Sequence, residues 1–274
     1  MASHADGYFA IGKTHTVCED YVRWGHTASG RAYVIVADGC SSSDDTDIGA
    51  RLLVRAADMH LAAWVDPSDF RVNFKEIALV AKVFAKTMNM NPECLDATLL
   101  IAVETETQIA VYKMGDGVVA VRQRNGDSQY VSHEFKTGAP YYANYLTNER
   151  RHQQFRDMPN NDVVVTYGIN GTETQTTQSM HDYAMSLDVP LLFDKSEVDL
   201  VVLTTDGSGS FRKGLDPVPL TEIVNQVLAV KASAGEFMVR RVKKFLGSHC
   251  VTQGWHHDDD FGVGAIFVDP EVVS

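Results

Sequence analysis

The sequence predicts an α+β fold in which two antiparallel sheets stack face to face, with a pair of helices outside each sheet. Three observations support this architecture. The middle of the 274-residue chain consists of apolar runs joined by short turns, which is typical of antiparallel hairpins. Two pairs of amphipathic helices flank it, and each pair needs a sheet on which to bury its apolar face. Strands and helices do not alternate regularly, which disfavours a doubly wound parallel sheet.

The chain begins with a predicted meander. Strands are expected at 8–12, 21–24 and 32–37, and the polar pair Glu19-Asp20 separates the first two. The 32–37 run is apolar and β-branched, so it is predicted to be a buried strand. It stops at Asp38-Gly39, where a polar loop begins.

Two helices are predicted next, over 47–65 and 70–88, separated by Asp66-Pro67-Ser68. The first is indicated by apolar residues at helical spacing, namely Ile48, Leu52, Val54, Met59 and Leu61. The buried stripe of the second is expected to comprise Phe74, Ile77, Leu79, Val80, Val83 and Phe84.

The remaining chain is mostly strand. Strands are predicted at 98–103, 108–113, 118–122, 128–133, 163–168, 198–205 and 261–268, and helices at 220–230 and 234–246. Residues 134–160 show no clean period and are interpreted as irregular surface or a flap, while 172–178 reads as a loop or an edge strand. Since no repeat or linker divides the sequence, we predict a single domain over residues 1–274.

Composition narrows the function classes. The net charge of −12 argues against a nucleic-acid partner, which would require a basic surface. The first residues lack the features of a signal peptide, and no apolar run approaches the 18 or so residues of a membrane span. The four cysteines lack CxxC spacing and are expected to be free thiols. We therefore expect a cytoplasmic protein without a membrane partner.

Acidic residues stand at the ends of several predicted strands. Asp38 and Asp206 each follow a buried strand and precede a glycine, Asp116 lies in a Gly-Asp-Gly turn, and 258–260 is a run of three aspartates before the last strand. Each of these acids alone is typical of a turn. Together they would repel one another unless cations compensated them. Two divalent cations about 3.5–4 Å apart could do so and activate a water.

The ordered set of motifs resembles one enzyme family. Its members here are Glu19-Asp20, Ala37-Asp38-Gly39, Thr98, Gly115-Asp116, Thr205-Asp206-Gly207 and Asp259-Asp260-Phe261-Gly262-Val263. They resemble the motifs of the metal-dependent serine/threonine protein phosphatases of type 2C, over residues 8–268. The resemblance implies a four-layer α-β-β-α sandwich, two Mn²⁺ or Mg²⁺ ions, a phosphorylated protein as substrate and a water bridging the metals as nucleophile. It also suggests a monomeric bacterial enzyme.

The resemblance assigns metal-binding roles residue by residue. Asp38 would bridge the two metals, and Asp206 and Asp259 would complete the first metal site. The carbonyl of Gly39 would bind the second metal. A shift of one residue within 258–260 stays open.

Three further acids have outer roles in the family pattern. Glu19 and Asp20 would hold metal-bound waters, and Asp116 matches the position of a weaker third metal. Many members read Gly-Asp-Ser-Arg at that turn, whereas this chain has Gly117 after Asp116, which weakens the third-metal assignment. Thr98 is expected to be structural.

The chain also departs from the family at the substrate phosphate. His15 stands where many members have an arginine, in a Gly-x-x-His form that resembles a bacterial branch. We expect His15 to be a phosphate ligand or proton donor, although a structural hydrogen bond is an equal alternative, and Lys13 could also reach the phosphate. Cys40 replaces a histidine of animal-type members. Catalytic roles thus fall to Asp38, His15 and Glu19.

Other readings remain open. The loss of the arginine would suit a weak or inactive family member that acts as a binding or regulatory module, and the same metals could serve a hydrolase of small phosphorylated molecules. His249-Cys250 and Trp255-His256-His257 invite a zinc interpretation, but they lack the paired short spacing of structural zinc sites. The Ser41–Ser43 run lacks the surroundings of a nucleophile elbow.

Overall fold

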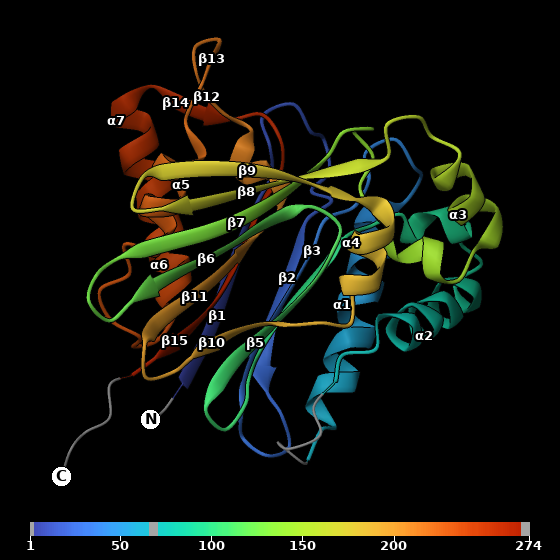
Figure 1. Cartoon of the computed structure of the whole chain (residues 1–274), viewed down its shortest axis with the longest axis horizontal. Helices are drawn as coiled ribbons and strands as arrows, with labels where there is room; N and C mark the ends of the chain where they lie inside the picture. Colours follow the sequence, from blue (N-terminus) through green and yellow to red (C-terminus); the bar gives the residue numbers. More distant parts are fainter. Residues whose placement is uncertain (1–2, 66–70, 270–274) are drawn as a thin grey trace.

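The computed structural model describes residues 3–65 and 71–269, which form four layers (Figure 1). A seven-stranded and a five-stranded antiparallel sheet lie face to face. Helices α1 (Thr46–Ala62) and α2 (Phe74–Thr87) cover the five-stranded sheet, and α5 (Leu220–Leu228) and α6 (Phe237–Lys244) cover the other. The α+β sandwich predicted from the sequence is confirmed.

The seven-stranded sheet has the order β1-β15-β11-β6-β7-β8-β9. Its strands are β1 (Ser3–Ala10), β6 (Gly117–Gln123), β7 (Ser128–Phe135), β8 (Asp162–Ile169), β9 (Thr172–Ser179), β11 (Val198–Thr204) and β15 (Phe261–Val268). The first and last strands of the chain pair in register from Ser3 opposite Val268 to Ala10 opposite Phe261. The threonine-rich 172–178 segment is the edge strand β9, one of its two predicted forms.

The five-stranded sheet has the order β10-β5-β4-β3-β2. Its strands are β2 (Tyr21–His26), β3 (Ala32–Ala37), β4 (Leu99–Glu104), β5 (Gln108–Met114) and β10 (Leu191–Asp194). As predicted, β3 is buried along its whole length. A small third sheet joins β12 (Phe211–Lys213), β13 (Asp216–Pro217) and β14 (Trp255–His257), which the sequence pattern did not predict.

Three apolar cores hold the four layers together. Val34, Val36 and Leu100 of one sheet meet Val201 and Leu203 of the other in the central core. Alternate residues of the same strands face the helices, as the two-residue period of a strand requires. Strands such as β3 and β11 are therefore buried on both faces, which explains their continuous apolar sequences.

The predicted stripe of α2 is wrong in part. Leu79, Val80 and Val83 are exposed, whereas alanines at 78, 81 and 85 join Phe74 and Ile77 on the buried face. Small side chains let α2 pack closely against α1 and the 92–95 turn, so alanine outweighs the larger apolar residues here. The helix begins at Phe74 because the Asn73 side chain accepts a hydrogen bond from the Glu76 amide. The predicted start at residue 70 lies outside the described residues.

The first helix differs more modestly from its prediction. It ends at Ala62 rather than at 65, and Met59, which was expected to be buried, is 46% exposed. Its buried face includes Val54 and Leu61, as expected, together with Leu53 and Ala57. A pattern of large apolar residues alone did not distinguish the two sides of this alanine-rich helix.

Residues 134–160, expected to be irregular, contain short helices. These are η3 (Ala143–Leu146) and α3 (Glu149–Arg156), with α4 (Met180–Ser186) following β9. Tyr141, Tyr145 and Phe155 are buried and pack on one another, with the Tyr145 and Phe155 rings 4.7 Å apart. The segment is thus an ordered aromatic cluster, whose lack of period reflects short elements. A π-helical segment, η5 (Phe245–Cys250), continues α6 into α7 (Val251–Gln253).

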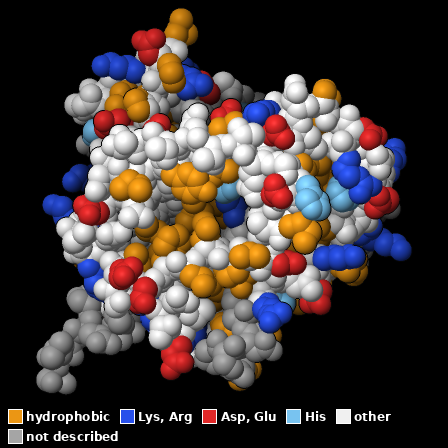
Figure 2. Space-filling view, viewed as in Figure 1, with side chains coloured by type: hydrophobic (Ala, Val, Ile, Leu, Met, Phe, Trp, Pro, Cys, Tyr) orange, Lys and Arg blue, Asp and Glu red, His pale blue; other side chains and the backbone are white. Residues whose placement is uncertain are grey.

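One face carries an apolar hollow of about 210 Å³. Figure 2 shows hydrophobic side chains gathered there, where the seven-stranded sheet extends past edge strand β10. The hollow is lined by Val119, Val121, Gln129, Tyr130, Val131, Tyr167, Gly168, Ile169, Leu191, Leu192 and Phe193. It is the open side of the core between the sheets. Within 3–65 and 71–269, no helix is long and apolar enough to cross a membrane.

Candidate metal centre

Three aspartates from separate strands meet at one end of the sandwich. Asp38 follows β3, Asp116 forms the turn between β5 and β6, and Asp206 follows β11. One carboxylate oxygen of each lies within 4.8 Å of the others. The central strands β3 and β11 place Asp38 and Asp206 opposite each other across the interface between the sheets, which is why acids so distant in sequence converge.

The backbone around Asp38 is fixed by its neighbours. The Asp38 carbonyl accepts a hydrogen bond of 2.8 Å from the Thr98 amide, and the Gly39 amide donates to the Glu19 carbonyl at 3.2 Å. Gly39 packs so closely on α1 that a Cβ atom would lie 2.7 Å from the carbonyl oxygen of Thr46. A glycine is therefore required at residue 39, as its place beside a ligand site suggested. Thr98 is buried, and its expected structural role stays a prediction.

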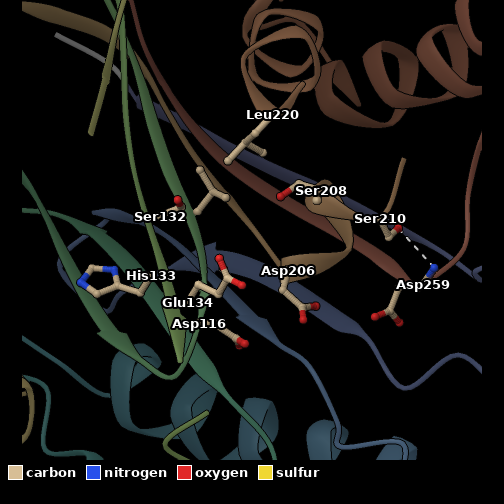
Figure 3. Close-up of a pocket in the computed structure, with 12 residues that line it drawn as sticks. Asp116, Ser132, His133, Glu134, Asp206, Ser208, Ser210, Leu220 and Asp259 are labelled. Atoms are coloured by element: carbon tan, nitrogen blue, oxygen red, sulfur yellow. Dashed lines mark hydrogen bonds between the residues drawn. The ribbon is translucent and has the colours of Figure 1, made fainter. Parts of the chain in front are cut away.

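Two connected cavities open beside these acids. The smaller, of about 260 Å³, is lined by Asp38, Gly39, Cys40, Ser41, Ser42, Asp116, Gly138, Pro140, Tyr142, Asp206 and Asp259. The larger, of about 380 Å³, shares three aspartates with it and extends between β6, β7 and the start of α5. In Figure 3, Asp116, Asp206 and Asp259 approach this space from different elements, and the Asp259 amide donates a hydrogen bond to the Ser210 hydroxyl.

The electrostatics of the acids are unfavourable without cations. Burial, followed by the negative charge of Asp206, raises the pKa of Asp38 well above its ordinary value. Burial and Asp206 likewise raise the pKa of Asp116, although Lys113 acts in the opposite direction. Enclosure by protein and the charge of Asp259 raise the pKa of Asp206 to about 6. Each carboxylate thus disfavours the ionisation of the others.

Asp20 adds a buried carboxylate behind this group. One of its oxygens accepts a 2.7 Å hydrogen bond from the Thr205 hydroxyl, and the other has no hydrogen-bond partner. Burial, then the charges of Asp206 and Asp260, raise the pKa of Asp20 well above its usual range. Oδ1 of Asp116 is likewise buried without a partner.

This donor set fits hard divalent cations. Carboxylate and carbonyl oxygens are the preferred ligands of Mg²⁺ and Mn²⁺. The lining of the smaller cavity, which lies wholly in the described part of the chain, includes neither lysine nor arginine. Orphaned buried oxygens and mutual repulsion are both relieved when cations bind. The expected metal residues Asp38, Gly39, Asp116, Asp206 and Asp259 therefore share one cavity suited to that role.

His15 and Glu19 form a second, adjoining group. The His15 ring lies 3.2 Å from Asp260, 3.3 Å from Asp259 and 3.7 Å from Glu19, measured to carboxylate oxygens. Burial lowers the pKa of His15, but the hydrogen bond and charge of Asp260 and the charges of Asp259 and Glu19 raise it overall. Lys13 is exposed, and its amide donates to the His257 carbonyl at 3.0 Å.

The structure separates the three aspartates at 258–260. Asp259 lines the smaller cavity. Asp260 is 2% exposed and accepts hydrogen bonds from two backbone amides, Gly12 at 2.7 Å and Glu19 at 2.6 Å. Asp258 is half-buried near His256. Asp259 is thus the one of the three that lines the cavity with Asp38 and Asp206, while Asp260 groups with His15 and Glu19; the preferred register stays a prediction.

Two features near the centre were missed by the sequence reasoning. The 134–160 segment contributes Gly138, Pro140 and Tyr142 to the cavity lining. Its sequence contains a Gly-Ala-Pro turn signal but no helical or strand periodicity of apolar residues. A half-buried lysine also lies next to the Asp116 turn. Lys113 Nζ donates to the Gly117 carbonyl at 2.8 Å and contacts His133, and burial lowers its pKa to about 7.

The residues with a possible zinc interpretation show no such arrangement. Among the described residues, groups of three or more His, Cys, Asp or Glu side chains with converging ligand atoms do not include His249, Cys250, His256 or His257. Ser43 of the serine run donates a 2.8 Å hydrogen bond to Asp96, consistent with a structural role for that loop.

Comparisons with known proteins agree with this architecture. The family model described as Protein phosphatase 2C matches residues 11–247. A bacterial serine phosphatase aligns with a TM-score of 0.55 and 11% identity over 98% of this chain and 99% of its own. The serine/threonine phosphatase Stp1 from Staphylococcus aureus aligns with a TM-score of 0.54 and 12% identity over 98% and 96%. The S. agalactiae serine/threonine phosphatase gives 0.51 and 14% over 98% and 100%. A comparison with curated proteins gave no match.

Proposed function

The chain belongs to the protein phosphatase 2C family of serine/threonine phosphatases, and from this premise we propose that it is a metal-dependent enzyme that hydrolyses phosphoserine and phosphothreonine in proteins. The observation that carries the proposal is the convergence of Asp38, Asp116 and Asp206, with oxygens within 4.8 Å of one another, on a cavity without a lysine or arginine in its lining. Such a cluster of acids needs cations to be stable at neutral pH.

The proposed cofactors are two Mn²⁺ or Mg²⁺ ions, with a third as a further possibility at Asp116. When bound, such ions supply an activated bridging water as nucleophile and offset charge on the phosphoryl oxygens. Asp38 has an oxygen within 4.8 Å of oxygens of both Asp116 and Asp206, and it would contact both ions. Asp206 and Asp259 would complete one site and the Gly39 carbonyl the other, since all four line the same cavity.

The remaining site residues are proposed to act around this centre. Glu19 and Asp20 would orient bound waters, because neither belongs to the cavity lining and one buried oxygen of Asp20 has no hydrogen-bond partner. Of the two basic residues of the 11–20 loop, Lys13 has the exposed charge and is the one proposed to meet the substrate phosphate. The histidine-for-arginine replacement at His15 would then mark a distinct branch of the family.

The cellular setting is also a proposal. Residues 1–274 would act as one monomeric domain in a bacterial cytoplasm, on a phosphorylated protein. The larger cavity supports a peptide substrate, because it extends about 380 Å³ of space from the acids along β6 and β7 to Leu220. A small phosphorylated molecule would not need that extension.

A phosphopeptide assay with Mn²⁺ tests the proposal. Wild type should release phosphate, and Asp38→Ala should lose this activity together with Mn²⁺ binding. Asp44→Ala is the matched control, because Asp44 is an exposed acid of the neighbouring loop. Equal activity in wild type and Asp38→Ala would refute the proposal. Wild-type protein that binds Mn²⁺ without releasing phosphate from any phosphopeptide would instead indicate an inactive binding or regulatory module.

A further inference from the structure

The loop that carries His15 is docked against the segment that carries Asp259. The amides of Lys13 and Thr14 donate to the carbonyls of His257 and Asp258 at 3.0 and 3.1 Å. Gly12 approaches so closely that a Cβ atom would lie 2.3 Å from the carbonyl carbon of Asp259. Residue 12 must therefore be glycine for the loop to dock, and docking fixes the place of the His15 ring.

Both ring nitrogens of His15 face carboxylates. Nε2 lies 3.3 Å from Oδ1 of Asp259, and Nδ1 lies 3.2 Å from Oδ2 of Asp260. Glu19 follows His15 by four residues in the same loop, and its carboxylate lies 3.7 Å from Nδ1 of His15. The His15 side chain is only 17% exposed. A phosphate approaching this ring would meet three negative groups, because each ring nitrogen already faces a carboxylate.

Asp260 provides a rigid support for the ring. Its two oxygens are held by the amides of Gly12 and Glu19, so the carboxylate cannot rotate. His15 thereby links a fixed acid on one side to Asp259 on the other.

The contact with His15 decides which oxygen of Asp259 is free. Oδ1 of Asp259 accepts a 2.8 Å hydrogen bond from the Asp260 amide and also faces His15 Nε2. Oδ2 is then the oxygen left for the cavity shared with Asp38 and Asp206. Outer groups that hold a ligand carboxylate in this way set its orientation and its affinity for metal.

We propose that His15 is a positioning residue of the metal centre, which orients Asp259 and Glu19, and does not bind the substrate phosphate. The inference rests on the proposed function only in taking Asp259 as a metal ligand. It assigns His15 a place behind the ligands, where the sequence had suggested a contact with substrate.

Calorimetric titration of the metal-free protein with Mn²⁺, without substrate, tests this role. His15→Ala should bind Mn²⁺ about 10–100-fold more weakly, as is typical when an outer partner is lost. His15→Gln keeps a donor and should recover part of the affinity. His26→Ala is the matched control, because His26 is exposed at the end of β2 and should leave the affinity unchanged. If His15→Ala does not fold, His15→Gln alone carries the comparison, with a smaller loss expected.

Steady-state kinetics, with KM measured at saturating Mn²⁺ and the rate also followed over a range of Mn²⁺ concentrations, add a readout that loss of structure would not mimic. The KM of His15→Ala for a phosphopeptide should stay within about twofold of wild type, while the Mn²⁺ concentration for half-maximal rate rises in step with the weaker binding. A KM raised tenfold or more with unchanged Mn²⁺ affinity would overturn the proposal in favour of a phosphate contact. If His15→Ala lost one bound ion and kept the others with unchanged affinity, His15 would be a metal ligand, and the proposal would be overturned. Wild type that binds Mn²⁺ but lacks phosphatase activity would refute the proposed function, while the affinity comparison would still decide the role of His15.

Discussion

Two groups of acids in this protein lie in different settings. Asp58, Asp96 and Glu104 lie on the five-stranded side, and each is paired with basic or polar groups. Asp38, Asp116 and Asp206 meet mainly one another. The first set behaves as expected of structural acids, since buried charges are normally paired.

The paired acids have complete sets of partners. Asp58 contacts Arg23 and Arg55 at 2.6 Å each and accepts a 2.7 Å hydrogen bond from the Tyr33 hydroxyl. Glu104 accepts a 2.9 Å hydrogen bond from Lys195, and both side chains are almost fully buried.

The difference shows where the fold retains unfavourable charge. The fold pairs Asp58 with two arginines, so it could in principle also place a basic side chain beside Asp38. The lining of that cavity nevertheless supplies only oxygen donors and apolar groups besides Cys40. Unfavourable charge of this kind is typical of functional sites, where stability is lower than the fold could reach. The comparison can be tested from both sides.

The largest effect is expected for removal of a carboxylate from the unpaired set. Asp206→Asn keeps the size of the side chain but removes its charge from the cluster. Its kcat/KM for a phosphopeptide should fall by more than about 100-fold, beyond the loss typical of outer partners. Asp216→Asn, at an exposed acid of β13, should retain wild-type kinetics. A loss below tenfold for Asp206→Asn would mean that Asp206 is not a ligand.

On the paired side, Lys195→Met should destabilise the protein by about 3 kcal/mol, because it leaves Glu104 buried without its lysine. Urea unfolding measures this change. Adding Glu104→Met should restore part of the stability, since the uncompensated charge is then removed as well. If the double variant were less stable than Lys195→Met, the pair would not be the source of the effect.

Asp58→Asn should cost about 2 kcal/mol at neutral pH, because two arginines and a tyrosine hydroxyl lose a charged partner. Burial alone would raise the pKa of Asp58, but its contacts with Arg23 and Tyr33 lower it below the ordinary value. A lowered folded-state pKa gives stability that is present above the unfolded pKa and lost as pH falls through the folded one. The difference between wild type and variant should therefore shrink below about pH 4. A difference that is independent of pH would exclude the charged network as its cause.

The smallest effect is expected at Lys13. Its ammonium is exposed, and exposed charges are screened by salt. Lys13→Gln should raise KM by less than about threefold at physiological ionic strength, and by more at low salt. The same KM at both salt concentrations would remove Lys13 from the substrate site.

The layers of the fold were predictable because alternation and apolar runs are local signals. The strand 32–37 and the hairpins of 98–122 carry them strongly, and both lie where expected. The buried face of α2 was not predictable in the same way, since Ala78, Ala81 and Ala85 give no signal in a search for large apolar residues. The aromatic cluster around Tyr145 was not predicted for another reason. Its short elements are defined by packing with distant segments.

The acids of the centre could be found from their positions at strand ends, and the order of the motifs indicated the family. The surroundings of His15 could not be predicted from the sequence. Whether its nitrogens meet a substrate or Asp259 and Asp260 depends on the docking of two loops about 240 residues apart, for which Gly12 is a weak sequence signal. Local sequence patterns do not encode such contacts.

The most direct measurement of the central claim compares the unfolding free energies of wild type and Asp38→Asn, with and without Mn²⁺. Without metal, the variant should be more stable by about 1 kcal/mol, because one repelling charge has been removed. With Mn²⁺ at about 100 times its Kd, wild type should gain about 2.7 kcal/mol and the variant almost nothing, so the order of stability reverses. The same order under both conditions would contradict the account, because the unpaired acids would then not be a cation site.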